Sequence, residues 1–183
     1  MKITTTPLEG LVILEPIVHR DDRGYFFESY NKNTFETVTG QQINFVQDNQ
    51  ALSVKNVLRG LHYQNNPVPQ TKLLRVLEGS IWDIAVDIRK DSKTYGEWFG
   101  IELSAENKLQ FLIPAGFAHG YAVLSDVATV FYKCDNLYNK EYEGGVLWND
   151  PAINVDWKID ISKAIISEKD KKQPLLSGCN SLF

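Results

Sequence analysis

The chain has 183 residues with a formal net charge of -4, which argues against a nucleic-acid-binding surface. The length suits one domain with a real core, so we expect residues 1–183 to form a single domain. No apolar run approaches membrane-spanning length, and the N-terminus lacks a signal-peptide pattern. The two cysteines do not make a disulfide framework. We therefore expect a cytoplasmic protein with reduced thiols and no membrane partner.

Short strand-like runs separated by turn residues recur along the chain. In the first half they are residues 11–14, 25–30, 45–50 and 57–64, with a charged turn at 21–24 and a helical turn at 33–38. In the second half they are residues 72–77, 81–89, 98–103, 109–113, 121–124 and 129–134. Only the segment after Trp157 has a weak helical pattern. The pattern predicts an all-β sandwich or barrel with a few short helices.

Residues 57–64 carry side chains that are costly to bury without a purpose, namely Arg59, His62 and Gln64. Arg59 is suited to bind an anion, and His62 is a base that titrates near neutral pH. Strict alternation would place the two on opposite faces of the strand. We therefore expect either that Arg59 lies at the strand mouth or that Gly60 forms a bulge.

A metal site is the obvious competing hypothesis for His62. Barrel metal sites built on His-x-His need a second histidine two positions on, where this chain has Gln64. His119 is the only plausible histidine partner, because His19 lies beside a charged turn. Two histidines without a cysteine pair are a poor ligand set for zinc or iron, so we predict no metal.

Each of the other candidates also has an ordinary structural interpretation. His119 follows a Pro-Ala-Gly corner and can bond local backbone, and Tyr132 can be a core or rim aromatic. Lys72 can be a solvated edge lysine, and the polar face that holds Asp83 can equally face solvent. On composition alone, residues 167–172 form a solvated charge run.

Five stretches in order change that interpretation: residues 23–28, 47–49, 59–64, 114–120 and 167–170. With them the chain resembles, nearly end to end, the dTDP-4-dehydrorhamnose 3,5-epimerase family. Arg-Gly-Leu-His and Phe-Ala-His-Gly are specific to this family among β-barrel proteins. The resemblance implies a cupin-type jelly-roll fold, a homodimer with exchanged N-terminal strands, and a reaction without cofactor.

The resemblance also implies a role for individual residues. His62 matches the base that removes the protons at C3 and C5 of a 4-keto sugar, and Asp170 matches the carboxylate that orients it. Tyr132 matches the acid that returns a proton from the opposite face, and Lys72 matches the cation beside the C4 oxygen. The positions that match substrate-binding residues are Arg23 and Arg59 for the diphosphate, Glu28, Gln47, Asp48 and Asn49 for the nucleotide and sugar, His119, Glu143 and Lys169 for further contacts, and Tyr138 near the nucleotide.

The implied reaction converts dTDP-4-dehydro-6-deoxy-D-glucose to dTDP-4-dehydro-β-L-rhamnose. The alternatives are an epimerase that inverts only C3 or only C5 of a related nucleotide sugar, and a non-catalytic cupin-type binder of sugar nucleotides. A metal-dependent cupin enzyme is a further rival. The sequence leaves open which carbons are inverted and which nucleotide is preferred.

Overall fold

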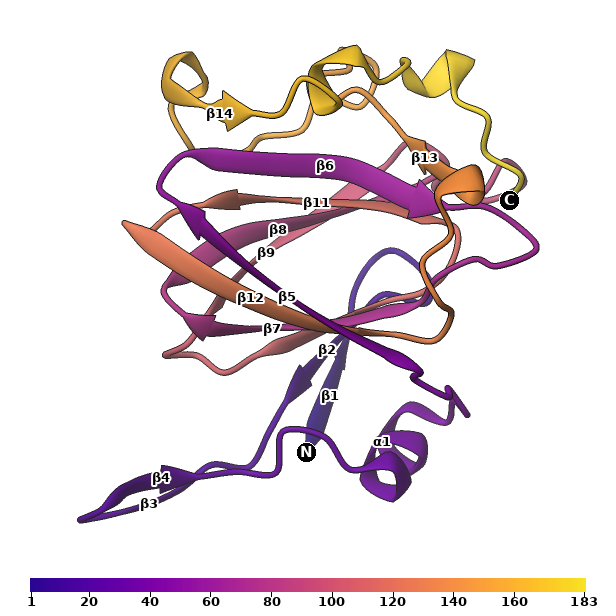
Figure 1. The fold of residues 1–183 in the computed structure, drawn as a ribbon. Coiled ribbons are helices and arrows are strands. Elements are labelled where there is room, and N and C mark those ends of the chain that lie inside the picture. The colour runs from indigo at the N-terminus through magenta and orange to yellow at the C-terminus, as the bar shows by residue number, and fades with distance from the viewer.

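Two six-stranded sheets pack face to face in the computed structural model, which describes residues 1–183 (Figure 1). In strand order, the first sheet consists of β1 (Lys2–Thr5), β2 (Val12–Glu15), β10 (Gln110–Ile113), β7 (Lys72–Glu78), β12 (Val127–Cys134) and β5 (Gln47–Val54). The second consists of β13 (Glu143–Gly145), β6 (Val57–Gln64), β11 (Phe117–Val123), β8 (Ser80–Asp87) and β9 (Trp98–Ser104), with β14 (Ile165–Ile166) parallel to β6. The predicted β-sandwich is confirmed.

The helical content is small, as the sequence predicts. The one α-helix, α1 (Lys32–Thr39), begins at Asn31, whose side chain accepts from the Thr34 N–H, and ends at Gly40 in the left-handed conformation. It buries Phe35. The short 3-10 turns are η1 (Lys140–Tyr142), η2 (Ile161–Lys163), η3 (Asp170–Lys172) and η4 (Leu176–Gly178). None of these helices has the length and apolar character needed to cross a membrane.

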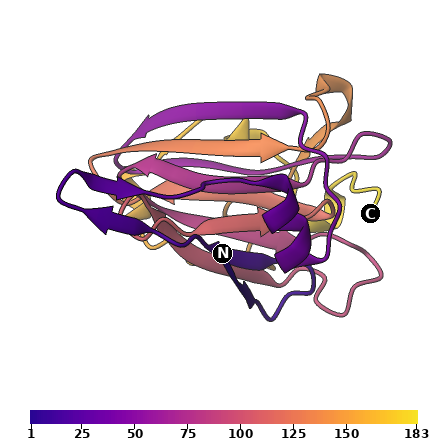
Figure 2. The same ribbon diagram turned by 90° about the horizontal axis from the view of Figure 1, so that it is seen from below.

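Two sequence-based expectations are wrong in part. The predicted strand at residues 25–30 is only the three-residue β4 (Gly24–Phe26), paired with β3 (His19–Asp21) in a hairpin that projects from the sandwich (Figures 1 and 2). The segment after Trp157 forms no α-helix. There Asp160 and Ser167 accept hydrogen bonds from nearby backbone N–H groups, which favours isolated turns over a continuous helix.

Both faces of the second sheet are covered, which corrects the expectation for β8. Its Asp83 and Ala85 face the other sheet inside the sandwich, and both are fully buried. The opposite face of β8, with Ile84 and Val86, packs against Trp157 and other apolar side chains of the C-terminal segment. The face of β8 that holds Asp83 therefore does not contact solvent. One apolar layer lies between the two sheets, and a second lies between β8 and the C-terminal segment.

A bulge in β6 brings Arg59 and His62 to the same face. His119 of β11 pairs with His62, whereas Tyr121, two residues on, pairs with Arg59, so β6 has one extra residue in this interval. Gly60 lies in this interval with φ of 129°. Of the two arrangements expected for Arg59 and His62, the structure has the bulge, and it places both side chains on one wall of the sandwich interior.

We expect Gly60→Ala to lower the free energy of unfolding more than Gly24→Ala does. The two glycines have nearly equal φ, 129° and 127°, so the conformational cost of a side chain is matched. An added Cβ at Gly60 would lie 2.5 Å from the Gly120 Cα, whereas at Gly24 it would meet nothing within 4 Å. The excess should be at least about 1 kcal/mol in chemical denaturation at equal protein concentration. Equal losses would show that the close approach of β6 and β11 does not constrain the bulge.

Candidate active site

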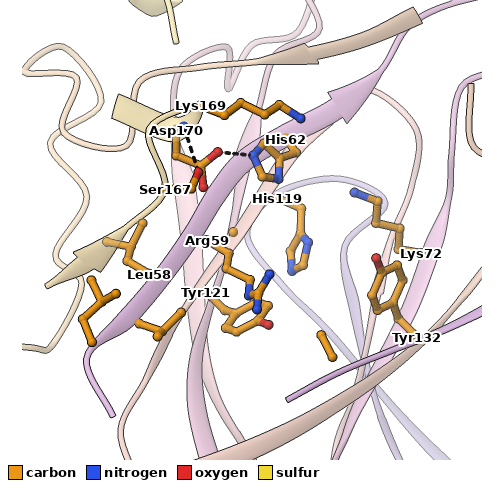
Figure 3. Close-up of a pocket in the computed structure, with 14 residues that line it drawn as sticks. Leu58, Arg59, His62, Lys72, His119, Tyr121, Tyr132, Ser167, Lys169 and Asp170 are labelled. Atoms are coloured by element: carbon orange, nitrogen blue, oxygen red, sulfur yellow. Dashed lines mark hydrogen bonds and ion pairs between the residues drawn. The ribbon is translucent and has the colours of Figure 1, made fainter. Parts of the chain in front are cut away.

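A cavity of about 490 Å³ opens between the two sheets and under the C-terminal segment (Figure 3). Seven of the sequence-predicted site residues line it: Arg59, His62, Lys72, His119, Tyr132, Lys169 and Asp170. They come from β6, β7, β11, β12 and the segment around η3, so residues distant in sequence meet at one place.

His62 and Asp170 form a short polar contact in the cavity, with 2.6 Å between His62 Nε2 and Asp170 Oδ1. The His62 side chain is 30% exposed, whereas that of Asp170 is 4% exposed. If Nε2–H donates to the carboxylate, Nδ1 is the nitrogen that carries the free lone pair. The contact thus defines which atom of His62 can accept a proton.

Asp170 is held as an anion by its surroundings. Burial opposes its ionisation, but the hydrogen bond and charge of His62, the Gly60 N–H at 3.4 Å and Ser167 together lower its pKa. Its own N–H donates to the Ser167 hydroxyl at 3.1 Å, which fixes the turn that carries the carboxylate. The segment is anchored further by β14, where Ile165 N–H donates to the Asn56 carbonyl. An anionic partner of this kind stabilises the protonated histidine.

The opposite wall of the cavity carries Lys72 and Tyr132, from neighbouring strands of the first sheet (Figure 3). Burial lowers the pKa of Lys72 and raises that of Tyr132 to about 12, so the phenol keeps its proton at neutral pH. The Lys72 ammonium donates no hydrogen bond to any group of the chain. It is therefore free to bind a group within the cavity.

Arg59 is oriented by two residues that sequence reasoning missed. Its Nε–H donates to the Ser53 hydroxyl at 3.1 Å, and Ser53 lies 3.5 Å from the hydroxyl of the buried Tyr121. Tyr121 also lines the cavity. The strand alternation of residues 47–54 could have indicated that Ser53 shares a face with Asn49, but nothing local marks Tyr121.

A chain of polar contacts lies at the cavity mouth. Lys169 Nζ contacts Glu143 Oε1 at 2.5 Å, and the Tyr138 hydroxyl donates to Glu143 Oε2 at 3.1 Å. The Tyr138 N–H donates to Gln47 Oε1, whose amide donates in turn to Asn49 Oδ1 at 2.9 Å. The structure thus connects four further predicted residues, Glu143, Tyr138, Gln47 and Asn49, to the cavity-lining Lys169.

Three predicted substrate-binding residues lie away from this cavity. Asp48 is on the outer face of β5, where it pairs with Lys133 at 2.9 Å. Arg23 lies in the projecting hairpin, 90% exposed and paired with Asp21. Glu28 accepts from Asn31 Nδ2 at 3.0 Å near the start of α1. Within one chain these residues do not complete the site, and their binding roles stay predictions.

Gln64, which stands where a His-x-His metal site would have its second histidine, has a structural role. Its amide donates to the carbonyls of Val68 and Leu137, and its Oε1 accepts from the Asn139 N–H at 2.8 Å. It ties together the loops beside the cavity. No group of three or more His, Cys, Asp or Glu side chains in the chain is arranged to hold a metal ion.

The fold and this cavity define a cupin-like β-sandwich with paired acid–base groups on two facing walls. A family model described as dTDP-4-dehydrorhamnose 3,5-epimerase matches residues 5–178. The chain belongs to the dTDP-4-dehydrorhamnose 3,5-epimerase family.

Individual relatives are similar over nearly their whole length. The dTDP-4-dehydrorhamnose 3,5-epimerase of Salmonella typhimurium is 50% identical over 176 residues, covering 96% of each chain. The crystal structure of a 3,5-epimerase from Legionella pneumophila in complex with dTDP-4-keto-L-rhamnose is 45% identical, with a TM-score of 0.92 and coverage of 96% of this chain and 93% of that one. A 3'-monoepimerase from Streptomyces bikiniensis, solved with dTDP-quinovose, is 31% identical with a TM-score of 0.88, covering 94% and 86%.

We expect the stability difference between the wild type and Asp170→Asn to depend on pH. Because the folded-state pKa of Asp170 lies below its unfolded value, its contribution is present above about pH 4 and is lost as the pH falls through the folded-state pKa. Denaturation at pH 7 and at pH 3 should therefore show a larger difference at pH 7. Glu168→Gln, an exposed carboxylate two residues away, is the control. A difference that stays constant over this range would contradict an ionised Asp170 carboxylate stabilised by the folded structure.

Proposed function

We propose that this protein is an isomerase that inverts C3 and C5 of dTDP-4-dehydro-6-deoxy-D-glucose, giving dTDP-4-dehydro-β-L-rhamnose, and that it works in the cytoplasm. The observation that carries the proposal is the placement of the His62–Asp170 pair and the Tyr132 phenol on facing walls of one cavity. Inversion of a carbon needs proton removal from one face and proton delivery to the other. The activities named for the relatives support the same conclusion.

In the first step Nδ1 of His62 takes the proton from the carbon next to the C4 ketone. The C–H electron pair forms a C=C bond to C4, and the carbonyl electrons move onto the C4 oxygen. Asp170 stabilises the resulting imidazolium through the 2.6 Å contact. A base alone would be inefficient here, because the negative charge on the C4 oxygen also has to be stabilised.

Lys72 supplies that stabilisation as a positive charge positioned before the reaction begins. Its ammonium is unpaired within the chain and borders the cavity beside Tyr132. No oxidation or reduction takes place, since the same two electrons return to the carbon–hydrogen bond. The proposed reaction therefore needs no nicotinamide, and the lysine takes the polarising role that a metal has in other enzymes.

In the second step Tyr132 delivers its phenolic proton to the carbon from the opposite face. Burial keeps this proton in place at neutral pH, as a general acid requires. The tyrosinate regains a proton from solvent and His62 releases one, so the enzyme is restored without net proton change. Repeating the two steps at the second carbon gives the doubly inverted sugar.

We propose that Arg59 contacts the diphosphate of the substrate and that a partner subunit supplies Arg23 and Glu28. In this homodimer the N-terminal strands are exchanged. Support comes from the projecting hairpin, in which Phe26 is 72% and Tyr25 56% exposed, since isolated proteins seldom leave such aromatic residues uncovered on an extended arm. Binding energy at the diphosphate is remote from the reacting carbons and holds the sugar in position.

An epimerase specific for C3 is the second candidate. The favouring observation is that a 3'-monoepimerase shares the fold with a TM-score of 0.88. The fold does not distinguish the two specificities. The greater identity to the 3,5-epimerases favours inversion at both carbons.

We expect Tyr132→Phe and His62→Ala to separate the two proton transfers. Without the phenol, His62 can still remove a proton and return a deuteron to the same face in heavy water, so exchange should persist while inverted product falls by about 10²–10⁴-fold. Without His62, exchange and inversion should both be lost. NMR of dTDP-4-dehydro-6-deoxy-D-glucose in heavy water measures both. Wild-type exchange in His62→Ala would remove the assignment of the base.

The exchange of N-terminal arms can be tested by mixing two inactive variants, Arg23→Ala and His62→Ala. If each cavity uses Arg23 of the partner, a mixed dimer has one cavity with both residues intact. After denaturation and joint refolding, statistical pairing should restore about one quarter of the wild-type activity. If Arg23 serves its own chain's cavity, mixing should restore nothing.

A further inference from the structure

A fully buried carboxylate, Asp83, lies behind the cavity wall and has no part in the steps above. Its side chain points into the sandwich interior, and its exposed fraction is 0%. Both of its oxygens contact His119 Nε2, at 3.0 Å and 3.1 Å, and it has no other hydrogen-bond partner. An anion this deep needs compensation by nearby positive charge or by hydrogen bonds.

The strand register explains why Asp83 and His119 meet. Asp83 of β8 pairs with Tyr121 of β11, while His119 pairs with Ala85. Residues two apart on a strand share a face, so Asp83 and His119 are diagonal neighbours inside the sandwich. His119 in turn borders the cavity, where Lys72 extends from the facing sheet (Figure 3).

Lys72 has few possible counter-ions. The titratable groups around it are Cys134 and Tyr132 of β12, Asp83 of β8, His119 of β11, His62 of β6 and Glu143 of β13. Burial raises the pKa of Cys134 to about 11, so the thiol is neutral. Glu143 is already paired with Lys169 at 2.5 Å, and Asp170 with His62 at 2.6 Å. Asp83 is the remaining carboxylate whose charge acts on Lys72.

We propose that Asp83 is a positioning residue that acts as the buried counter-ion of Lys72 and, by accepting from Nε2–H, fixes the tautomer of His119 with Nδ1 as its free nitrogen. The role of this ion pair in catalysis rests on the proposed function, because that function requires a protonated Lys72. The electrostatic coupling between the two groups does not rest on it, and it is measurable without substrate.

The directions of the pKa shifts agree with this arrangement. Burial lowers the pKa of Lys72, and the charge of Asp83 opposes that change. Burial raises the pKa of Asp83, and His119 and Lys72 oppose that change. Burial also lowers the pKa of His119, which keeps the ring neutral. Removing the charge of Asp83 must therefore lower the pKa of Lys72 further.

The test is Asp83→Asn, whose amide oxygen can still accept from His119 while the charge is gone. The Lys72 ammonium is titrated by ¹³C NMR of lysine-labelled, substrate-free protein, with its signal assigned from Lys72→Arg. We expect its pKa to fall by about one unit or more, the effect of losing a close opposite charge. The basic limb of the kcat profile should move to lower pH by the same amount. An unchanged Lys72 titration in the folded variant would overturn the proposal.

The matched control is Asp87→Asn on the same strand. Asp87 is also fully buried, but Arg89, Ser92 and Thr94 hold it at the far end of β8. Its loss should leave the Lys72 titration as in the wild type. If the titration shifts as expected in Asp83→Asn but wild-type protein fails to epimerise the sugar, the coupling stands and the proposed function fails.

A reciprocal measurement keeps the proposal testable if Asp83→Asn does not fold. Coupling between two charges is mutual, so removing the positive charge in Lys72→Met must make protonation of the His119–Asp83 pair easier. ¹⁵N NMR of histidine-labelled protein should show the pair titrating about one unit higher. A pair that titrates as in the wild type would contradict the assignment of Asp83 as the counter-ion.

Discussion

The contact between His62 and Asp170 is the interaction on which the rest of the site depends. It joins residues 108 positions apart, one on a central strand and one on a turn of the C-terminal segment. The bulge at Gly60 presents His62 to the cavity, and the N–H of the same Gly60 donates to Asp170. One irregularity in β6 therefore positions the base, its carboxylate and, through Arg59, a binding group for an anion. A regular strand in this place would turn either Arg59 or His62 out of the cavity.

The two-sheet architecture places reactive side chains on opposite sides of the cavity, which the inversion of a carbon requires. The second sheet carries His62 and His119, and the first carries Lys72 and Tyr132, so a sugar ring bound between the sheets would meet different groups on its two faces. The charged groups also differ between the two sides of the cavity. In the proposed reaction the anion Asp170 supports the base, whereas the cation Lys72 stabilises the oxygen that becomes negative. Burial between the two sheets strengthens the effect of these charges, since water screens them less than it would on the protein surface.

Features of this structure that depend on local sequence could be predicted, whereas those that depend on contacts between distant residues could not. The limits of β6 at Val57 and Gln64, the short helix near residues 33–38 and the need for a bulge follow from local patterns and turn chemistry. The pairing of Asp170 with His62 does not, because no local pattern links residues so far apart, and only the family resemblance indicated it. The burial of Asp83 was missed because alternation separates two faces but does not say that both are covered. Arg23 and Glu28 lie outside the cavity of their own chain, and a sequence does not say which subunit a side chain serves.

In the proposed reaction, two carbons flanking one ketone each lose a proton and regain one from solvent on the opposite face. The most direct measurement is NMR and mass analysis of the product formed by the wild-type protein from dTDP-4-dehydro-6-deoxy-D-glucose in heavy water. We expect one deuterium at C3 and one at C5 of a product with both centres inverted. Deuterium at C3 alone, with C5 unchanged in label and configuration, would contradict it and identify the protein as an epimerase specific for C3.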